Sequence, residues 1–205
     1  MSHNHLCLSS VILTVSGTVL IICLMLTGLT SCSSTAGQRS LWSQDHTPLP
    51  PTGLTYTVIG HVDGIKHFVI AYDDAVLRGG RILSDAGATF LTNRGVSTVI
   101  AVHPSETEAL LLYEYNINLL EFPADRNEPI PPDVVADFIN VVSKSEKPVY
   151  LRSEEGTHIA GAFGMAYRIH ACHWPYQDAL IEFGRLGGSL KDDHTMTESL
   201  RSGDK

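Results

Sequence analysis

Charged residues are scarce in this chain and absent from its beginning. Only 18% of the 205 residues are Asp, Glu, Lys or Arg, and none of them precedes Arg39. Basic residues are fewer than acidic ones: the chain has 14 Lys and Arg against 22 Asp and Glu, which gives a formal net charge of −8. Because nucleic-acid binding requires clustered cations that contact phosphates, we predict no nucleic-acid partner. With 43% hydrophobic residues, the chain is too apolar to be disordered throughout.

The uncharged beginning is also strongly apolar. Residues 6–29 are mostly aliphatic, which is enough to cross the hydrocarbon core of a bilayer. This segment ends in LTSC at residues 29–32, which resembles the lipobox of bacterial lipoproteins. The resemblance implies that residues 1–31 are a signal peptide, that Cys32 is lipidated, and that the protein is exported and membrane-anchored in a bacterial cell envelope. A retained transmembrane anchor is the alternative, and the opening MSHNH lacks the Lys or Arg typical of signal peptides.

Cysteine is too rare for a disulfide framework. Cys7 and Cys23 lie in the apolar segment, Cys32 ends it, and Cys172 stands alone far downstream. If the signal is removed, the soluble part keeps one thiol, so the fold cannot depend on an intramolecular bridge. Residues 32–54 are rich in Ser, Thr, Pro and Gly, which predicts a flexible tether.

Hydrophobic runs alternate with helical patterns from residue 55 onward, which predicts one α/β domain over residues 55–186. The β-rich runs predict strands at residues 56–60, 67–72, 96–102, 117–123 and 149–151. Helical periodicity and capping residues predict helices near residues 84–93, 105–115, 131–142, 157–171 and 175–183. The polar segment 187–205 is predicted to be a disordered tail.

The strand, loop and helix at residues 148–171 carry the functional information. A loop that enters a helix N-terminus presents unpaired backbone N–H groups and the positive end of the helix dipole, and such a place binds anions. The loop consists of eight residues, namely Arg152, Ser153, Glu154, Glu155, Gly156, Thr157, His158 and Ile159. We take these residues as the candidate anion-binding loop.

This loop and its surroundings resemble the dual-specificity and protein tyrosine phosphatases. LRGG at residues 77–80, GVSTVI at 95–100, FPAD at 122–125 and the pair Gly156 and Gly161 are similar to segments of that family in the same order. The resemblance implies a tyrosine phosphatase-like fold, with a central, mostly parallel sheet flanked by helices. It also implies that Asp125 occupies the general-acid position and Ser153 the position of the catalytic cysteine.

The chain departs from the family's catalytic signature, which is Cys, five residues, Arg, then Ser or Thr, usually with His before the Cys. Arg152 replaces that His, Ser153 the Cys, Ile159 the phosphate-binding Arg, and Ala160 the hydroxyl residue. A serine hydroxyl does not ionise as the family's thiolate does. Glu154 and Glu155 also add negative charge where a phosphate would bind, unless both carboxylates point to solvent.

We therefore predict a membrane-tethered pseudophosphatase that acts by binding a phosphorylated or anionic ligand, or a protein partner, with no cofactor. One alternative is a phosphoric-ester hydrolase of atypical mechanism, in which His158 or Asp125 activates Ser153. Another is an envelope scaffold lipoprotein with no anion site. No metal site is predicted, because His170, Cys172 and His173 are too close along the chain to converge on one ion.

Overall fold

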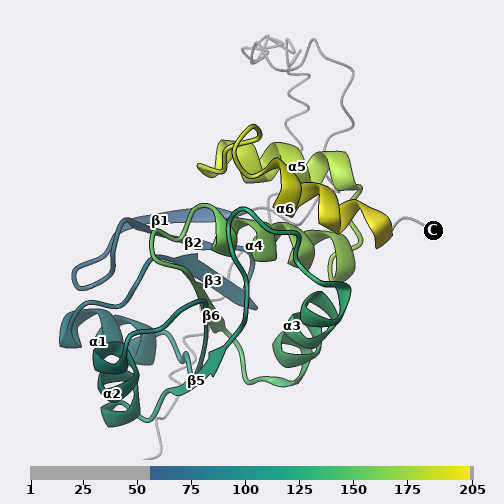
Figure 1. The fold of residues 1–205 in the computed structure, drawn as a ribbon. Coiled ribbons are helices and arrows are strands. Elements are labelled where there is room, and N and C mark those ends of the chain that lie inside the picture. The colour runs from purple at the N-terminus through teal and green to yellow at the C-terminus, as the bar shows by residue number, and fades with distance from the viewer. Residues whose placement is uncertain (1–55, 204–205) are drawn as a thin grey trace, which may run out of the picture. The chain divides into compact units, whose positions relative to one another are not determined.

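The structure, a computed structural model, describes residues 56–203, and these build a six-stranded mixed sheet (Figure 1). The strands are β1 (Thr57–His61), β2 (Phe68–Ala71), β3 (Val76–Gly79), β4 (Thr98–Ala101), β5 (Asn118–Glu121) and β6 (Val149–Arg152). They lie in the order β1-β2-β3-β6-β4-β5. β1, β2 and β3 pair antiparallel, whereas the β3–β6, β6–β4 and β4–β5 pairs are parallel. The predicted α/β fold with a mostly parallel central sheet is confirmed.

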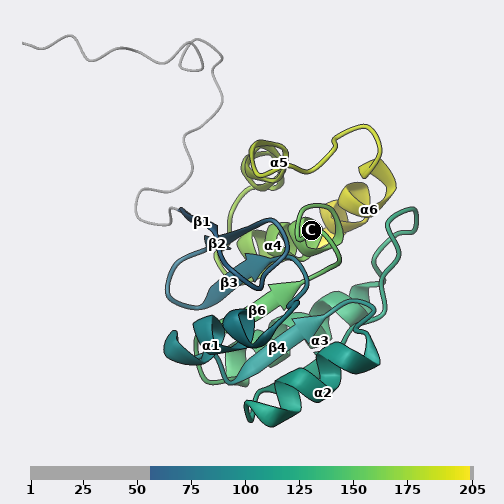
Figure 2. The same cartoon turned by 90° about the vertical axis from the view of Figure 1, so that its left-hand side faces the viewer.

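Helices cover both faces of this sheet. α1 (Asp85–Asn93) and α2 (Glu106–Glu114) lie on one side, and α3 (Pro132–Lys144) and α4 (Ile159–His170) on the other (Figures 1 and 2). α5 (Tyr176–Arg185) and α6 (His194–Ser199) pack against α4. The central strands therefore have helices on both faces, as parallel sheets require.

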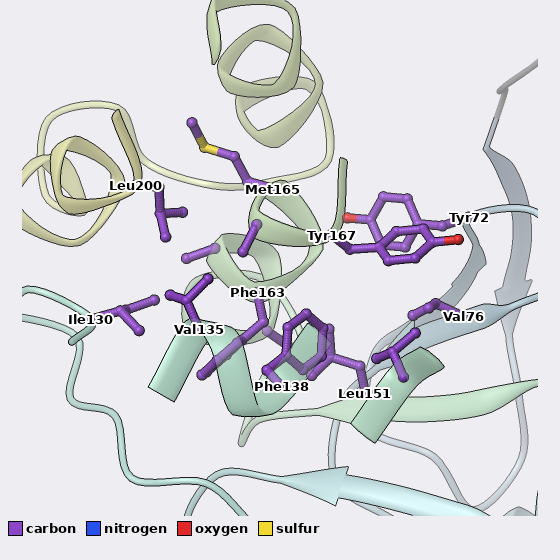
Figure 3. Close-up of a cluster of buried hydrophobic side chains, with 14 of the residues drawn as sticks. Tyr72, Val76, Ile130, Val135, Phe138, Leu151, Phe163, Met165, Tyr167 and Leu200 are labelled. Carbon is purple, nitrogen blue, oxygen red and sulfur yellow. The ribbon is translucent and has the colours of Figure 1, made fainter. Parts of the chain in front are cut away.

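Side chains that alternate along a strand pack into two separate hydrophobic cores. Val149 and Leu151 of β6 face the core under α3 and α4, and Tyr150 faces the core under α1 and α2. In the larger core, the rings of Phe138 on α3 and Phe163 on α4 lie 5.0 Å apart between their centroids (Figure 3). This packing fixes α4, and with it the loop that enters α4, against the centre of the sheet.

Most predicted elements occur where the sequence indicates them. The opening hairpin forms as β1 and β2. Ser105 caps α2, because its side chain accepts a hydrogen bond from the backbone N–H of Glu108. α4 begins at Ile159 rather than at Thr157, and the strand predicted over residues 96–102 is limited to Thr98–Ala101. These differences lie at element ends, where hydrophobic periodicity is a weak guide.

The prediction of a disordered tail from residue 187 is wrong for residues 189–203. This segment, which we call the C-terminal segment, contains α6 and a 3₁₀ turn at Leu200–Gly203. Met196 and Leu200 are 0% and 3% exposed in the larger core, so two apolar side chains four residues apart anchor an otherwise polar sequence. Asp193 is also fully buried, among hydrogen-bond donors. The folded domain thus extends past residue 186.

The predictions for residues 1–54 lie outside the described residues. They concern the signal peptide or anchor, lipidation at Cys32 and the tether. Within residues 56–203, no helix combines the length and the apolar character that a membrane crossing needs. The single cysteine of this part, Cys172, is a free thiol.

Candidate anion-binding loop

The loop at residues 153–158 connects the carboxyl end of β6 to the start of α4. β6 lies between β3 and β4, so the loop is near the middle of the sheet edge. Gly156 turns the chain with φ +74°, a left-handed conformation that side chains with a Cβ rarely adopt. A Cβ at this position would also collide with the backbone of Gly79 and Gly80. Glycine is thus required for the loop to lie this close to the end of β3.

Ser153 lies at the base of the loop and is 5% exposed. Its Oγ accepts hydrogen bonds from the N–H groups of Gly156 at 3.2 Å and Ala160 at 3.4 Å. The side chain therefore points into the loop, at the position to which the family resemblance assigns the nucleophile. The hydroxyl thus satisfies the N–H of Gly156 in the loop and the N–H of Ala160, the second residue of α4.

Further backbone donors of the loop are free. Within residues 56–203, no acceptor binds the N–H groups of Glu154, Glu155, Thr157, His158 or Ile159. Buried or half-buried N–H groups normally find a partner in the protein, in water or in a ligand. Successive unpaired N–H groups at a helix start form a concave site for an anion.

Arg152, which the sequence analysis placed in the candidate anion-binding loop, has no exposed surface. The side chain is fully buried beneath the loop, donating to the carbonyl of Val102 at 2.8 Å and pairing with the carboxylate of Glu108 on α2. Glu108 also accepts the backbone N–H of Ile82 at 3.0 Å. Burial raises the pKa of Glu108, and the charge of Arg152 opposes this effect. Arg152 is thus a structural cation that ties β6 to α2.

Glu154 and Glu155 are partly exposed and engaged with basic residues that follow β1 and β3. The Nζ of Lys66 lies 2.9 Å from Glu154 and 2.6 Å from Glu155, and Arg81 lies 3.3 Å from Glu154. His67 contacts Glu155 as well. Hydrogen bonds from Lys66 hold the pKa of Glu154 below its usual range. Lys66 and Arg81 thus compensate the negative charge of these two carboxylates, and neither carboxylate is unpaired in solvent.

Asp125 and His158 are each paired with a residue other than Ser153. The Oδ1 of the exposed Asp125 lies 3.3 Å from Nε2 of His103, and Nδ1 of His158 lies 2.7 Å from Oδ2 of Asp193. In the described part of the chain, Ser153 Oγ has no hydrogen bond to either. Activation of a serine requires a general base within hydrogen-bond reach, and among residues 56–203 neither of the two predicted candidates is hydrogen-bonded to Ser153 Oγ.

Arg126 and Asp193 form a further cluster beside the loop, together with His158, and no sequence motif indicates it. Asp193 accepts hydrogen bonds from Arg126 Nε at 2.7 Å, from His158 Nδ1, and from the N–H of Ser189 at 2.8 Å. Burial alone would raise the pKa of Asp193, but these three donors outweigh it and the pKa is lowered. Because residues 126, 158 and 193 lie far apart in the chain, no local motif could have indicated the cluster.

The cysteine and histidines near the end of α4 form no metal site. Arg168 donates to Cys172 Sγ at 4.0 Å, and burial raises the pKa of that thiol. Among residues 56–203, no three His, Cys, Asp or Glu side chains are placed to hold a metal ion.

Comparison with known families agrees with this geometry. Residues 66–198, more than half of the chain, match the model of a family described as DSP-PTPase phosphatase fused to NAD+ kinase. The chain belongs to this family. The resemblance to dual-specificity and tyrosine phosphatases is therefore confirmed for the fold, and the matched range covers α6 up to Glu198, within the segment predicted to be a disordered tail.

Solved structures share the fold at low sequence identity. Pseudomonas aeruginosa TpbA, as a Cys-to-Ser variant in complex with phosphotyrosine, is 20% identical with a TM-score of 0.58, over 74% of this chain and 96% of that chain. PTPMT1 is 14% identical with a TM-score of 0.52, over 63% and 92%. The catalytic domain of the PP-IP phosphatase SIW14 from S. cerevisiae, in complex with citrate, is 18% identical with a TM-score of 0.51, over 67% and 85%. No curated protein matches the chain.

Proposed function

We propose that this protein is a membrane-tethered pseudophosphatase that binds phosphorylated or similar oxyanionic groups at residues 153–159 without hydrolysing them. One observation carries this proposal. The loop retains five backbone N–H groups with no acceptor among the described residues, while a serine and an isoleucine stand at the positions of the family's nucleophile and phosphate clamp.

The missing groups account for the proposed lack of turnover. The family's nucleophile works as a thiolate, and a serine hydroxyl needs a base that Ser153 does not have here. An arginine that stabilises the transition state contributes roughly three to five powers of ten in rate in other phosphoryl-transfer enzymes. Ile159 offers no hydrogen bond, and its half-buried side chain packs against the larger core instead.

Binding is supported by what remains of the loop. Gly156 turns the chain in the left-handed conformation and α4 begins directly after the loop, and such a loop before a helix start leaves successive N–H groups available to an anion. Related structures of the same fold hold phosphotyrosine in TpbA and citrate in SIW14, both of which are anions. The tether rests on the sequence of residues 6–32 alone.

The test compares turnover with binding on one purified preparation. We expect no hydrolysis of aryl phosphates or phosphotyrosine peptides above a buffer control, together with a rise in melting temperature as phosphate is added, since a ligand that binds only the folded state stabilises it. Turnover that disappears in Ser153→Ala would instead establish an active hydrolase. Neither turnover nor binding would favour a scaffold without an anion site.

A repaired variant tests the loop more directly. Ser153→Cys with Ile159→Arg should tighten phosphate binding, and adding Glu154→Ala and Glu155→Ala should tighten it further because Lys66 and Arg81 lose their carboxylate partners. The gain should fall as salt rises. Leu110→Arg, at a 60% exposed position on α2, is the charge control and should leave binding unchanged. A repaired variant that folds and binds no anion would contradict the proposal.

A further inference from the structure

Cations lie on two sides of the loop, and they have different carboxylate partners. Lys66 Nζ is shared by Glu154 and Glu155, and Arg81 contacts Glu154, so this side of the loop is neutralised by the loop's own carboxylates. On the other side, Arg126 and His158 share the buried carboxylate of Asp193, and the exposed carboxylate of Asp192 lies 4.0 Å from Arg126 Nη2. Arg126 is the cation that a buried carboxylate joins to a residue of the loop, through His158.

Asp193 holds Arg126 in a way that leaves donors free. A guanidinium carries five N–H donors, and only Nε–H is used, by Asp193 Oδ1 at 2.7 Å. Nη2 lies 4.0 Å from Asp192, and neither Nη atom has a hydrogen-bond acceptor in the described part of the chain. The Arg126 side chain is 39% exposed, so these donors are open to a ligand.

The same carboxylate joins Arg126 to the loop itself. His158, whose backbone N–H is one of the free loop donors, binds Asp193 Oδ2 through Nδ1 at 2.7 Å. Its Nε2 has no partner among residues 56–203. The buried carboxylate of Asp193 thus bridges Arg126 and His158 of the loop. Because the Asp193 side chain has no exposed surface, it holds both of these side chains in place.

We infer that Arg126, positioned by Asp193, supplies the guanidinium that residue 159 lacks, and that together with the loop's N–H groups it binds the oxygens of a phosphate or phosphate monoester. This inference rests on the proposed function, since it names further ligands of the same site. A guanidinium pairs with two phosphate oxygens at once, which suits the open Nη atoms of Arg126. Asp193 is a positioning residue that does not touch the ligand.

The experiment measures inorganic phosphate binding to the full chain by calorimetry. Arg126→Gln should weaken binding by about tenfold or more, as loss of a charge-assisted hydrogen bond does. Arg201→Gln, which removes the same charge from a 54% exposed side chain paired with Glu198, should change binding less than about twofold. Asp193→Asn should weaken binding too, and Arg126→Gln should add little in the Asp193→Asn background, because both changes disable the same guanidinium.

A second measurement needs no variant. In the unaltered protein, phosphate should protect Arg126, but not Arg201, from modification by 2,3-butanedione, as read by peptide mass spectrometry. Wild-type phosphate affinity in a folded Arg126→Gln variant, or equal modification of Arg126 with and without phosphate, would overturn the inference and leave the proposed function standing. Failure of the wild-type chain to bind phosphate would overturn both.

Discussion

Ser153 stabilises the loop through its side-chain hydroxyl. Its hydroxyl accepts the N–H groups of Gly156 and Ala160, so the loop keeps internal support even when no anion is bound. Arg152, the residue before Ser153, also makes a structural contact, because its buried side chain pairs with Glu108 on α2. At the scale of single residues, Ser153 and Arg152 thus both make structural contacts.

Ser153→Ala removes no activity under the proposed function, but it should destabilise the domain. Two buried N–H groups lose their acceptor, and one such loss costs about 1–3 kcal/mol. Urea unfolding measures the change. Ser143→Ala, which removes an exposed hydroxyl bound to the carbonyl of Asn140, is the control and should cost less than about 0.5 kcal/mol. Equal stability of Ser153→Ala and the parent would show that water replaces the hydroxyl.

Arg152 and Glu108 should behave as a coupled pair. Arg152→Met leaves a carboxylate buried without its cation, which costs about 3–5 kcal/mol. Combining it with Glu108→Leu should recover much of that loss, because the uncompensated charge is gone. A double-mutant cycle of unfolding free energies measures the coupling, and additive effects of the two changes would contradict this account.

The C-terminal segment shows how an element can be stabilised from outside its own sequence. Residues 189–203 are polar, but Met196 and Leu200 enter the core and Ser199 Oγ accepts the N–H of Ile130 at 3.0 Å. Tyr176 of α5 donates to Glu198 at 2.8 Å. Asp193 adds the contacts to Arg126 and His158, so this segment holds the loop and the segment after Asp125 together.

The lowered pKa of Asp193 predicts a pH dependence of stability. A carboxyl whose pKa falls on folding stabilises the folded state above its unfolded pKa, and that stabilisation is lost as pH falls through the folded value. The difference in unfolding free energy between the parent and Asp193→Asn should therefore be constant above about pH 5 and shrink at lower pH. Denaturant unfolding at several pH values measures it. Asp192→Asn removes a charge from the 63% exposed neighbour and is the control. A difference that does not change with pH would contradict the assigned charge state.

For the whole molecule, the sequence suggests a phosphatase-like domain connected to a membrane. The structure describes the domain over residues 56–203, and the domain belongs to a family of dual-specificity-type phosphatases. The membrane connection stays a prediction from the uncharged residues 6–29 and the LTSC motif at 29–32.

Lipidation at Cys32 is the prediction at this scale. Mass spectrometry of the membrane fraction should find an acylated N-terminal Cys32, and Cys32→Ser should abolish the modification and the cleavage that exposes it. Cys172→Ser, at a half-buried free thiol, should leave the modification intact. An unmodified mature chain that still contains residues 6–31 would show a retained membrane segment instead.

The sequence alone determined the elements whose signals are local. Regular hydrophobic periods, the cap at Ser105 and the turn at Gly156 depend on neighbouring residues, so strands, helices and the candidate loop were predictable. Tertiary structure alone decided where charged side chains find partners. Arg152 turns inward because Glu108 on another element receives it, and Glu154 and Glu155 turn toward Lys66 and Arg81. Asp193 joins Arg126 and His158 across 67 and 35 residues of chain. A buried charge requires a partner, but its sequence position does not indicate which residue the fold will bring to it.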